Sequence, residues 1–264
     1  MTEPPEPTDP PRRHLQLATG PAAFTEEGTG PPILLVHGLP GSARDFRYLA
    51  PVLAETARVL RVDMPGFGQT PASTATGVTV SDRVDHLRRV LDVLELDRLL
   101  VVGHSMGGVL VTALAAAEPL RVSALGLISS PGLRTHRLYR RTNPRRLSRL
   151  LKTPLYPLLR APLRRGFTTG GFSRHFTDDE IARTIHEIAQ VSFTDHANNV
   201  ASLAIPTGVY WCADDPMIED AIATELADAA PDGPRMRYPD GGHNPQKPHA
   251  RALGDSLLTL TASA

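Results

Sequence analysis

The sequence has one cysteine, no net charge and no long apolar segment, and each absence narrows what the protein can be. Cys212 alone excludes an internal disulfide and a cysteine-based metal cage. Basic and acidic residues number 28 each, so the net charge points to no polyanionic partner. No apolar run reaches the roughly 18 residues of a membrane-spanning helix. The 41% hydrophobic content is enough for the core of a globular protein.

The N-terminal segment lacks the apolar h-region of a secretory signal and is rich in proline and acidic residues. A disordered tail is therefore predicted over residues 1–14. Without such a signal, we expect a cytoplasmic protein. The sequence also lacks a dinucleotide-binding glycine motif and a His/Asp cluster, so no cofactor or metal is expected.

Short apolar runs alternate with segments of helical periodicity along most of the chain. The predicted strands, with helices between them, cover residues 33–36, 59–63, 99–102, 122–128, 208–211 and 235–238. This alternation predicts an α/β fold, a mostly parallel doubly wound sheet with helices on both faces. The pattern stops after Gly132 and resumes at Thr207. We therefore expect a core of residues 15–132 and 198–264, with a helical insertion at 133–197.

A Gly-x-Ser-x-Gly motif stands between a predicted strand and a predicted helix, at Gly103-His104-Ser105-Met106-Gly107. This context predicts a nucleophile elbow, the tight turn that lifts a serine hydroxyl above the sheet. Neighbouring positions need glycine, because the turn leaves no room for side chains. Ser105 is thus the candidate nucleophile, against the alternative of a glycine-rich loop that contains a serine by chance.

Acyl transfer also needs N–H donors aimed at the developing oxyanion. Met106, the residue after the serine, is predicted to supply one through its backbone. Leu39, in the loop after the 33–36 strand, is predicted to supply the other. His37 in the same loop is expected to hold the loop by hydrogen bonds rather than to act as a base.

A serine nucleophile needs a histidine base and a carboxylate that orients it. Of ten histidines, His243 is the candidate, because a glycine-rich loop between the last strand and the last helix can carry it to the sheet edge. Asp214 and Asp215 follow the 208–211 strand, and either can serve as the acid. The order Ser, Asp, His differs from the orders in chymotrypsin and subtilisin.

Five segments together resemble the α/β-hydrolase superfamily, specifically its single-chain members with a cap. They are HGLPGS at 37–42, DMPGFGQT at 63–70, GHSMGG at 103–108, ADDP at 213–216 and GGH at 241–243. The resemblance runs from about residue 15 to the C-terminus and is weakest over 133–197, which would form the cap. In the family the acid stands three positions after a glycine. Cys212 occupies that glycine position here, so the resemblance favours Asp215 over Asp214.

The resemblance implies a hydrolase that cleaves a carboxylic ester, thioester or lactone through an acyl-enzyme on Ser105. Relatives that form alkyl-enzymes, the dehalogenases and epoxide hydrolases, carry aspartate at the nucleophile position instead. C–C bond hydrolases and cofactor-free haloperoxidase or perhydrolase-like enzymes share the serine and are alternatives. A ligand receptor on this fold is the alternative from another class, although a receptor needs no base beside its serine.

The segment between Pro131 and Thr177 contains twelve Lys or Arg residues and no Asp or Glu. A solvated cap surface is one interpretation. Another is attraction of a hydrophobic or anionic acyl substrate, or peripheral contact with a membrane surface. Binding to nucleic acid is not expected, because no recognised motif accompanies the charge. Pro154, Pro157 and Pro162 predict short helical pieces and a mobile lid. The sequence leaves the oligomeric state open.

Overall fold

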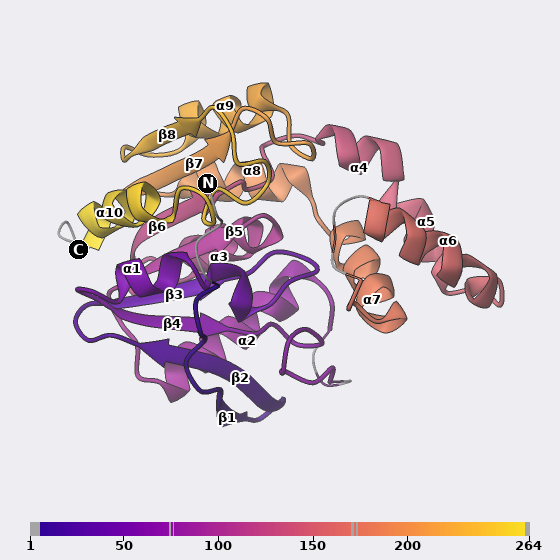
Figure 1. Ribbon diagram of the computed structural model, residues 1–264, viewed down its shortest axis with the longest axis horizontal. Coiled ribbons are helices and arrows are strands. Elements are labelled where there is room, and N and C mark those ends of the chain that lie inside the picture. The colour runs from indigo at the N-terminus through magenta and orange to yellow at the C-terminus, as the bar shows by residue number, and fades with distance from the viewer. Residues whose placement is uncertain (1–5, 74, 76, 170–171, 173, 262–264) are drawn as a thin grey trace.

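A computed structural model describes residues 6–73, 75, 77–169, 172 and 174–261. Its centre is an eight-stranded sheet with the order β1-β2-β4-β3-β5-β6-β7-β8 (Figure 1). The strands are β1 (Arg13–Leu17), β2 (Gly20–Glu27), β3 (Pro32–Val36), β4 (Arg58–Val62), β5 (Leu99–His104), β6 (Val122–Ile128), β7 (Thr207–Cys212) and β8 (Arg235–Tyr238). β1 and β2 pair antiparallel, β2 pairs antiparallel with β4, and the remaining pairs are parallel. The predicted α/β class is confirmed.

Helices cover both faces of the sheet and form two cores. On one face lie α1 (Leu49–Leu53) and α10 (Ala250–Thr261), with the short 3-10 helix η1 (Ala43–Phe46). On the other lie α2 (Val80–Val93), α3 (Met106–Ala117), α8 (Phe193–Ser202) and α9 (Asp220–Ala229). Within β3, Leu34 and Val36 pack in one core and Ile33 and Leu35 in the other, as expected of a strand buried on both faces. None of the described helices is both long and apolar enough to cross a membrane.

Four helices, together called the cap from here on, project to one side of the sheet (Figure 1). They are α4 (Arg137–Thr142), α5 (Pro144–Leu151), α6 (Tyr156–Thr169) and α7 (Asp178–Ala189). The boundary predicted at residue 197 falls inside α8, whose Val200 packs in the main core. The expectation of short pieces is wrong for α6, which runs through Pro157 and Pro162. Pro157 lies in the first turn, where an amide has no intrahelical acceptor.

A buried ion pair ties the cap to the core. Arg83 of α2 and Glu187 of α7 have side chains that are 1% and 3% exposed, and two hydrogen bonds join them. The cap helix α6, by contrast, has no buried residue. Of these two helices, α7 thus has a buried ion pair with the core, whereas α6 buries no side chain fully.

Residues 1–5 of the predicted disordered tail, residues 1–14, lie outside the described residues. The rest of this segment makes ordered contacts with the core. Asp9 forms an ion pair of 2.8 Å with the buried Arg61, and Arg12 forms one of 3.1 Å with the buried Asp63. The edge strand β1 begins at Arg13. The prediction of disorder is wrong from residue 6 onward, because composition does not reveal partners that lie far along the chain.

Candidate active site

Ser105 lies at a sharp turn between β5 and α3. Its backbone is strained, with φ 50° and ψ −125°, and its N–H donates to the Ile128 carbonyl oxygen at 2.9 Å. A Cβ on Gly103 would lie 2.4 Å from the Gly107 carbonyl oxygen, and one on Gly107 would lie 2.2 Å from that of Val36. Both positions therefore require glycine, as the sequence predicted.

Hydrogen bonds connect Ser105, His243 and Asp215, which come from three separate loops. The Ser105 Oγ is 2.8 Å from His243 Nε2, and Nδ1 is 2.7 Å from Asp215 Oδ2. The other carboxylate oxygen of Asp215 accepts from the backbone amides of Met217 at 2.8 Å and Ile218 at 3.1 Å. The structure thus brings together the three side chains that the sequence singled out.

These contacts decide the ionisation of Asp215. Burial opposes the charged form, but the hydrogen bonds from His243, Met217 and Ile218 outweigh it, so the pKa of Asp215 lies below its ordinary value. The ionised carboxylate accepts the Nδ1–H of His243. The Nε2 atom on the other side of the ring then faces the Ser105 hydroxyl.

Two residues that the sequence analysis did not assign to this task hold the His243 loop. Asp214 Oδ1 accepts from the Gly242 N–H at 2.8 Å, so this carboxylate bonds the loop backbone instead of the imidazole. His104 Nε2–H donates to the His243 carbonyl oxygen at 2.8 Å. Burial lowers the pKa of His104 to about 3, so His104 is neutral. The position of His104 directly before Ser105 is the sequence feature that could have pointed to this role.

The loop after β3 lies beside the nucleophile. A Cβ on Gly38 would come within 2.8 Å of the Ser105 Cβ. His37 holds the loop, because Nδ1–H donates to the Gly38 carbonyl oxygen at 2.7 Å and Nε2 accepts from the Met64 amide at 2.9 Å. The predicted holding role of His37 is confirmed. Leu39 of this loop lines the same cavity as Ser105.

Met106 lines this cavity too and is the first residue of α3. The first amides of a helix have no intrahelical acceptor and face the positive end of the helix dipole. The site therefore has an N–H donor directly after the nucleophile, next to the loop that carries Leu39.

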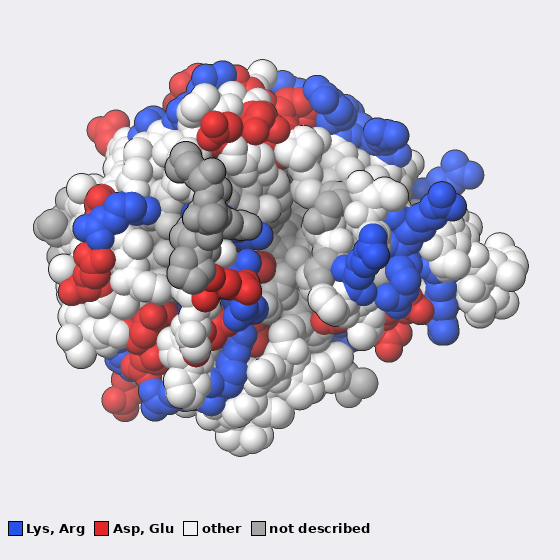
Figure 2. Space-filling view, viewed as in Figure 1, with Lys and Arg blue, Asp and Glu red and all other residues white. Residues whose placement is uncertain are grey.

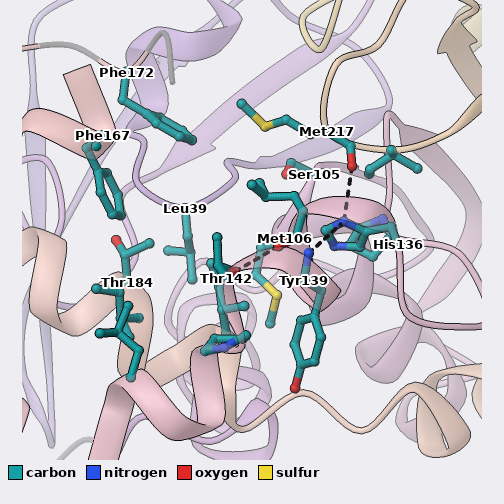
Figure 3. Close-up of a pocket in the computed structure, with 18 of the residues that line it drawn as sticks. Leu39, Ser105, Met106, His136, Tyr139, Thr142, Phe167, Phe172, Thr184 and Met217 are labelled. Carbon is teal, nitrogen blue, oxygen red and sulfur yellow. Dashed lines mark hydrogen bonds between the residues drawn. The ribbon is translucent and has the colours of Figure 1, made fainter. Parts of the chain in front are cut away.

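Ser105 and His243 lie at the floor of a cavity of about 500 Å³ beneath the cap, and Asp215 bonds His243 from outside the cavity lining. Phe167 and Phe172 lie on one side of it and His136 and Met217 on the other (Figure 3). Among the described residues, none of those lining the cavity is Lys, Arg, Asp or Glu. His136 Nδ1 bonds the Met217 carbonyl oxygen at 3.1 Å, and burial lowers the pKa of His136. The cavity is thus uncharged and mostly apolar.

The strand that leads to the acid carries Trp211, the single tryptophan of the chain. Its indole N–H donates to Asp220 Oδ1 at 2.8 Å, and Arg237 donates to both oxygens of the same carboxylate at 2.9 Å. Trp211 therefore fixes the end of β7 against the start of α9, four residues before Asp215.

The chain is similar in sequence to two hydrolases and in fold to an esterase of known structure. The chain is 41% identical over 109 residues to the 2-hydroxy-6-oxo-2,4-heptadienoate hydrolase of Pseudomonas putida, a match that spans 40% of the length of each. It is 27% identical over 253 residues to the 2-hydroxy-6-oxononadienedioate/2-hydroxy-6-oxononatrienedioate hydrolase of Cupriavidus pinatubonensis, with 88% of this chain and 83% of the relative covered. An esterase structure from Thermogutta terrifontis superposes with a TM-score of 0.75 at 21% identity, covering 94% of this chain and 97% of the esterase.

A family model described as the alpha/beta hydrolase fold matches residues 31–250. That range includes most of the parallel sheet, the cap and every residue that meets at the cavity floor. The chain therefore belongs to the alpha/beta hydrolase fold family.

Proposed function

We propose that the protein hydrolyses uncharged carboxylic esters, or related thioesters and lactones, through an acyl-enzyme on Ser105. The observation that carries the proposal is the hydrogen-bonded series from Ser105 through His243 to Asp215, with lengths of 2.8 and 2.7 Å. An imidazole in this position removes the serine proton as the hydroxyl attacks, and an oriented carboxylate stabilises the resulting imidazolium.

In the acylation step, the Ser105 Oγ bonds to the acyl carbon while its proton moves to His243 Nε2. The carbonyl oxygen gains the negative charge and faces the backbone N–H groups of Leu39 and Met106. As the C–O bond to the leaving group breaks, His243 passes the proton to the departing oxygen. Water then attacks the acyl-enzyme and gives a proton to His243. His243 passes this proton to the Ser105 Oγ as the acyl C–O bond breaks, which releases the acid and restores the serine hydroxyl.

The composition of the cavity favours an uncharged substrate. The two relatives named above act, by their names, on dienoates and dioates, which carry carboxylates. A carboxylate in this cavity would lose its hydration without a cationic partner, because no Lys or Arg lines the cavity in the described part of the chain. This supports ester hydrolysis over the C–C bond cleavage that those names describe.

The decisive test is Ser105→Ala with p-nitrophenyl butyrate and hexanoate as substrates. We expect kcat to fall by on the order of a million-fold, as when the serine of a protease triad is removed. Ser130→Ala is the matched control, since this buried serine bonds the Pro131 carbonyl oxygen instead of a base. Turnover that survives in Ser105→Ala would remove the acyl-enzyme from consideration.

A fluorophosphonate probe separates an enzyme from a receptor built on the same fold. We expect it to label the wild-type chain and leave Ser105→Ala unlabelled. A folded wild-type chain that resists labelling would contradict the proposal. Faster turnover of a dienoate than of any ester would favour C–C bond cleavage.

A further inference from the structure

Helix α6 lies at the edge of the molecule farthest from the sheet (Figure 1), and apolar side chains are exposed at its N-terminal end. Leu155, in the turn directly before α6, and Leu158, in its first turn, are 52% and 75% exposed. Only Val93 and Leu120 are comparably exposed large hydrophobic residues in the described part of the chain. The inner face of the same helix places Leu163 and Phe167 in the cavity wall. One helix thus separates the cavity from an exposed apolar surface.

Basic side chains lie beside these leucines. Arg164, Arg165 and Arg174 surround a surface hollow of about 360 Å³. Arg165 follows Leu158 by two helical turns, so the two residues share a face. Arg164 pairs with Asp178 at 2.6 Å, whereas no ion pair to Arg165 or Arg174 forms among the described residues. Figure 2 shows Lys and Arg gathered on the cap, next to a mostly uncharged tip.

We propose that this face of α6 docks on an anionic membrane surface. Lipid phosphates would occupy the hollow between Arg164, Arg165 and Arg174, and Leu155 and Leu158 would enter the boundary with the acyl chains. The exposed leucines favour a lipid surface over nucleic acid, because a phosphodiester backbone offers them no apolar partner. Docking brings the cavity wall next to a reservoir of apolar molecules.

The test is sedimentation of the full chain with vesicles of phosphatidylcholine alone and of phosphatidylcholine mixed with phosphatidylglycerol. We expect binding to the mixed vesicles, weaker binding to neutral ones, and loss of binding as salt is raised. The measurement is repeated with Ser105→Ala. Docking needs no turnover, so failure of the proposed esterase activity would leave this result unaffected.

Two sets of variants separate the contributions of the basic and the apolar side chains to membrane binding. Each basic residue near an anionic surface strengthens binding about fivefold, so Arg164→Gln, Arg165→Gln and Arg174→Gln together should weaken it about a hundredfold. The matched control neutralises three exposed arginines of the core, Arg89, Arg98 and Arg251. Leu155→Ser with Leu158→Ser should weaken binding about tenfold, whereas Leu120→Ser, outside the cap and 91% exposed, should not.

The proposal also predicts that none of these five substitutions in and beside α6 changes kcat/KM on a soluble ester, because the five side chains do not line the cavity. Absence of binding to the mixed vesicles would overturn it. So would equal binding to both kinds of vesicle without salt dependence, or equal loss in the core-arginine control. Displacement from vesicles by duplex DNA, with no effect of the leucine variants, would identify a polyanion-binding face instead.

Discussion

The floor and the roof of the cavity are held in place by different means. At the floor, backbone geometry fixes each group: Ser105 on its strained turn and His243 on a loop that Asp214 and His104 bond. The roof includes α6, which has no buried residue, and α7, which a buried ion pair anchors, together with residues of α4 and α5. Changes at the floor should therefore alter the rate for every substrate alike, and changes at the roof should alter which substrate is preferred.

The largest expected effect is that of Asp215→Asn at the floor. Removing the carboxylate favours the wrong imidazole tautomer, so kcat should fall by on the order of 10⁴-fold. Steady-state kinetics on short and long p-nitrophenyl esters should show the same factor for both. The neighbouring Asp214→Asn is the control and should cost at most about tenfold, since Asp214 bonds only the loop backbone. Equal losses in the two variants would contradict the assigned roles.

At the roof, Glu187→Gln should cause the largest loss of stability. It leaves the Arg83 charge buried without a partner, and we expect the free energy of unfolding to fall by about 3–5 kcal/mol in urea titrations. Arg164→Gln breaks the exposed pair with Asp178 and should cost less than about 1 kcal/mol. Similar values for both variants would show that the buried pair does not anchor α7.

Substitutions that enlarge the cavity allow α6 and α7 to be compared. Leu163→Ala on α6 should shift the preference in kcat/KM toward longer or bulkier acyl chains by about tenfold. It should change the midpoint of thermal unfolding little, since the Leu163 side chain is only partly buried. Ile185→Ala on α7 should produce a similar shift and also cost about 2–5 kcal/mol of stability. A large loss of stability in Leu163→Ala would show that α6 and α7 contribute alike to the stability of the fold.

The smallest expected effect is on how the stability of the fold depends on pH. Burial lowers the pKa of His86, on the helix that anchors α7, to about 4. In the unfolded chain this histidine titrates near its ordinary value of about 6.5. Between these values the unfolded state binds more protons, so stability falls as the pH is lowered. His86→Met should reduce that slope by up to one proton in urea titrations between about pH 4 and 7. An unchanged slope would show that His86 is already protonated in the folded state.

Local constraints made much of the floor predictable from the sequence. The glycines around Ser105 are needed within a few residues of it, and the loop of His243 stands out by its composition. The contacts of Asp214 and His104 were not predictable, because their partners are backbone atoms of a distant loop. Local reasoning did not distinguish the two aspartates, and the family spacing favoured the one that contacts the imidazole.

The edge of the sheet and the cap show where such reasoning fails. The β1–β2 hairpin and residues 6–12 depend on pairing with β4 and its neighbours, which no local pattern reveals. In α6, leucines lie on both faces, so periodicity does not tell which face lines the cavity and which faces solvent. The prolines led to a wrong prediction of short helical pieces, because α6 continues through Pro157 and Pro162.

The bond between Trp211 and Asp220 gives the protein a built-in optical reporter. With a single indole in the chain, tryptophan fluorescence comes from one point beside the acid-bearing loop. Any rearrangement of that loop when an acyl group occupies the serine should register as a change in intensity or wavelength. Stopped-flow mixing could then follow the loop in real time, without a chemical label.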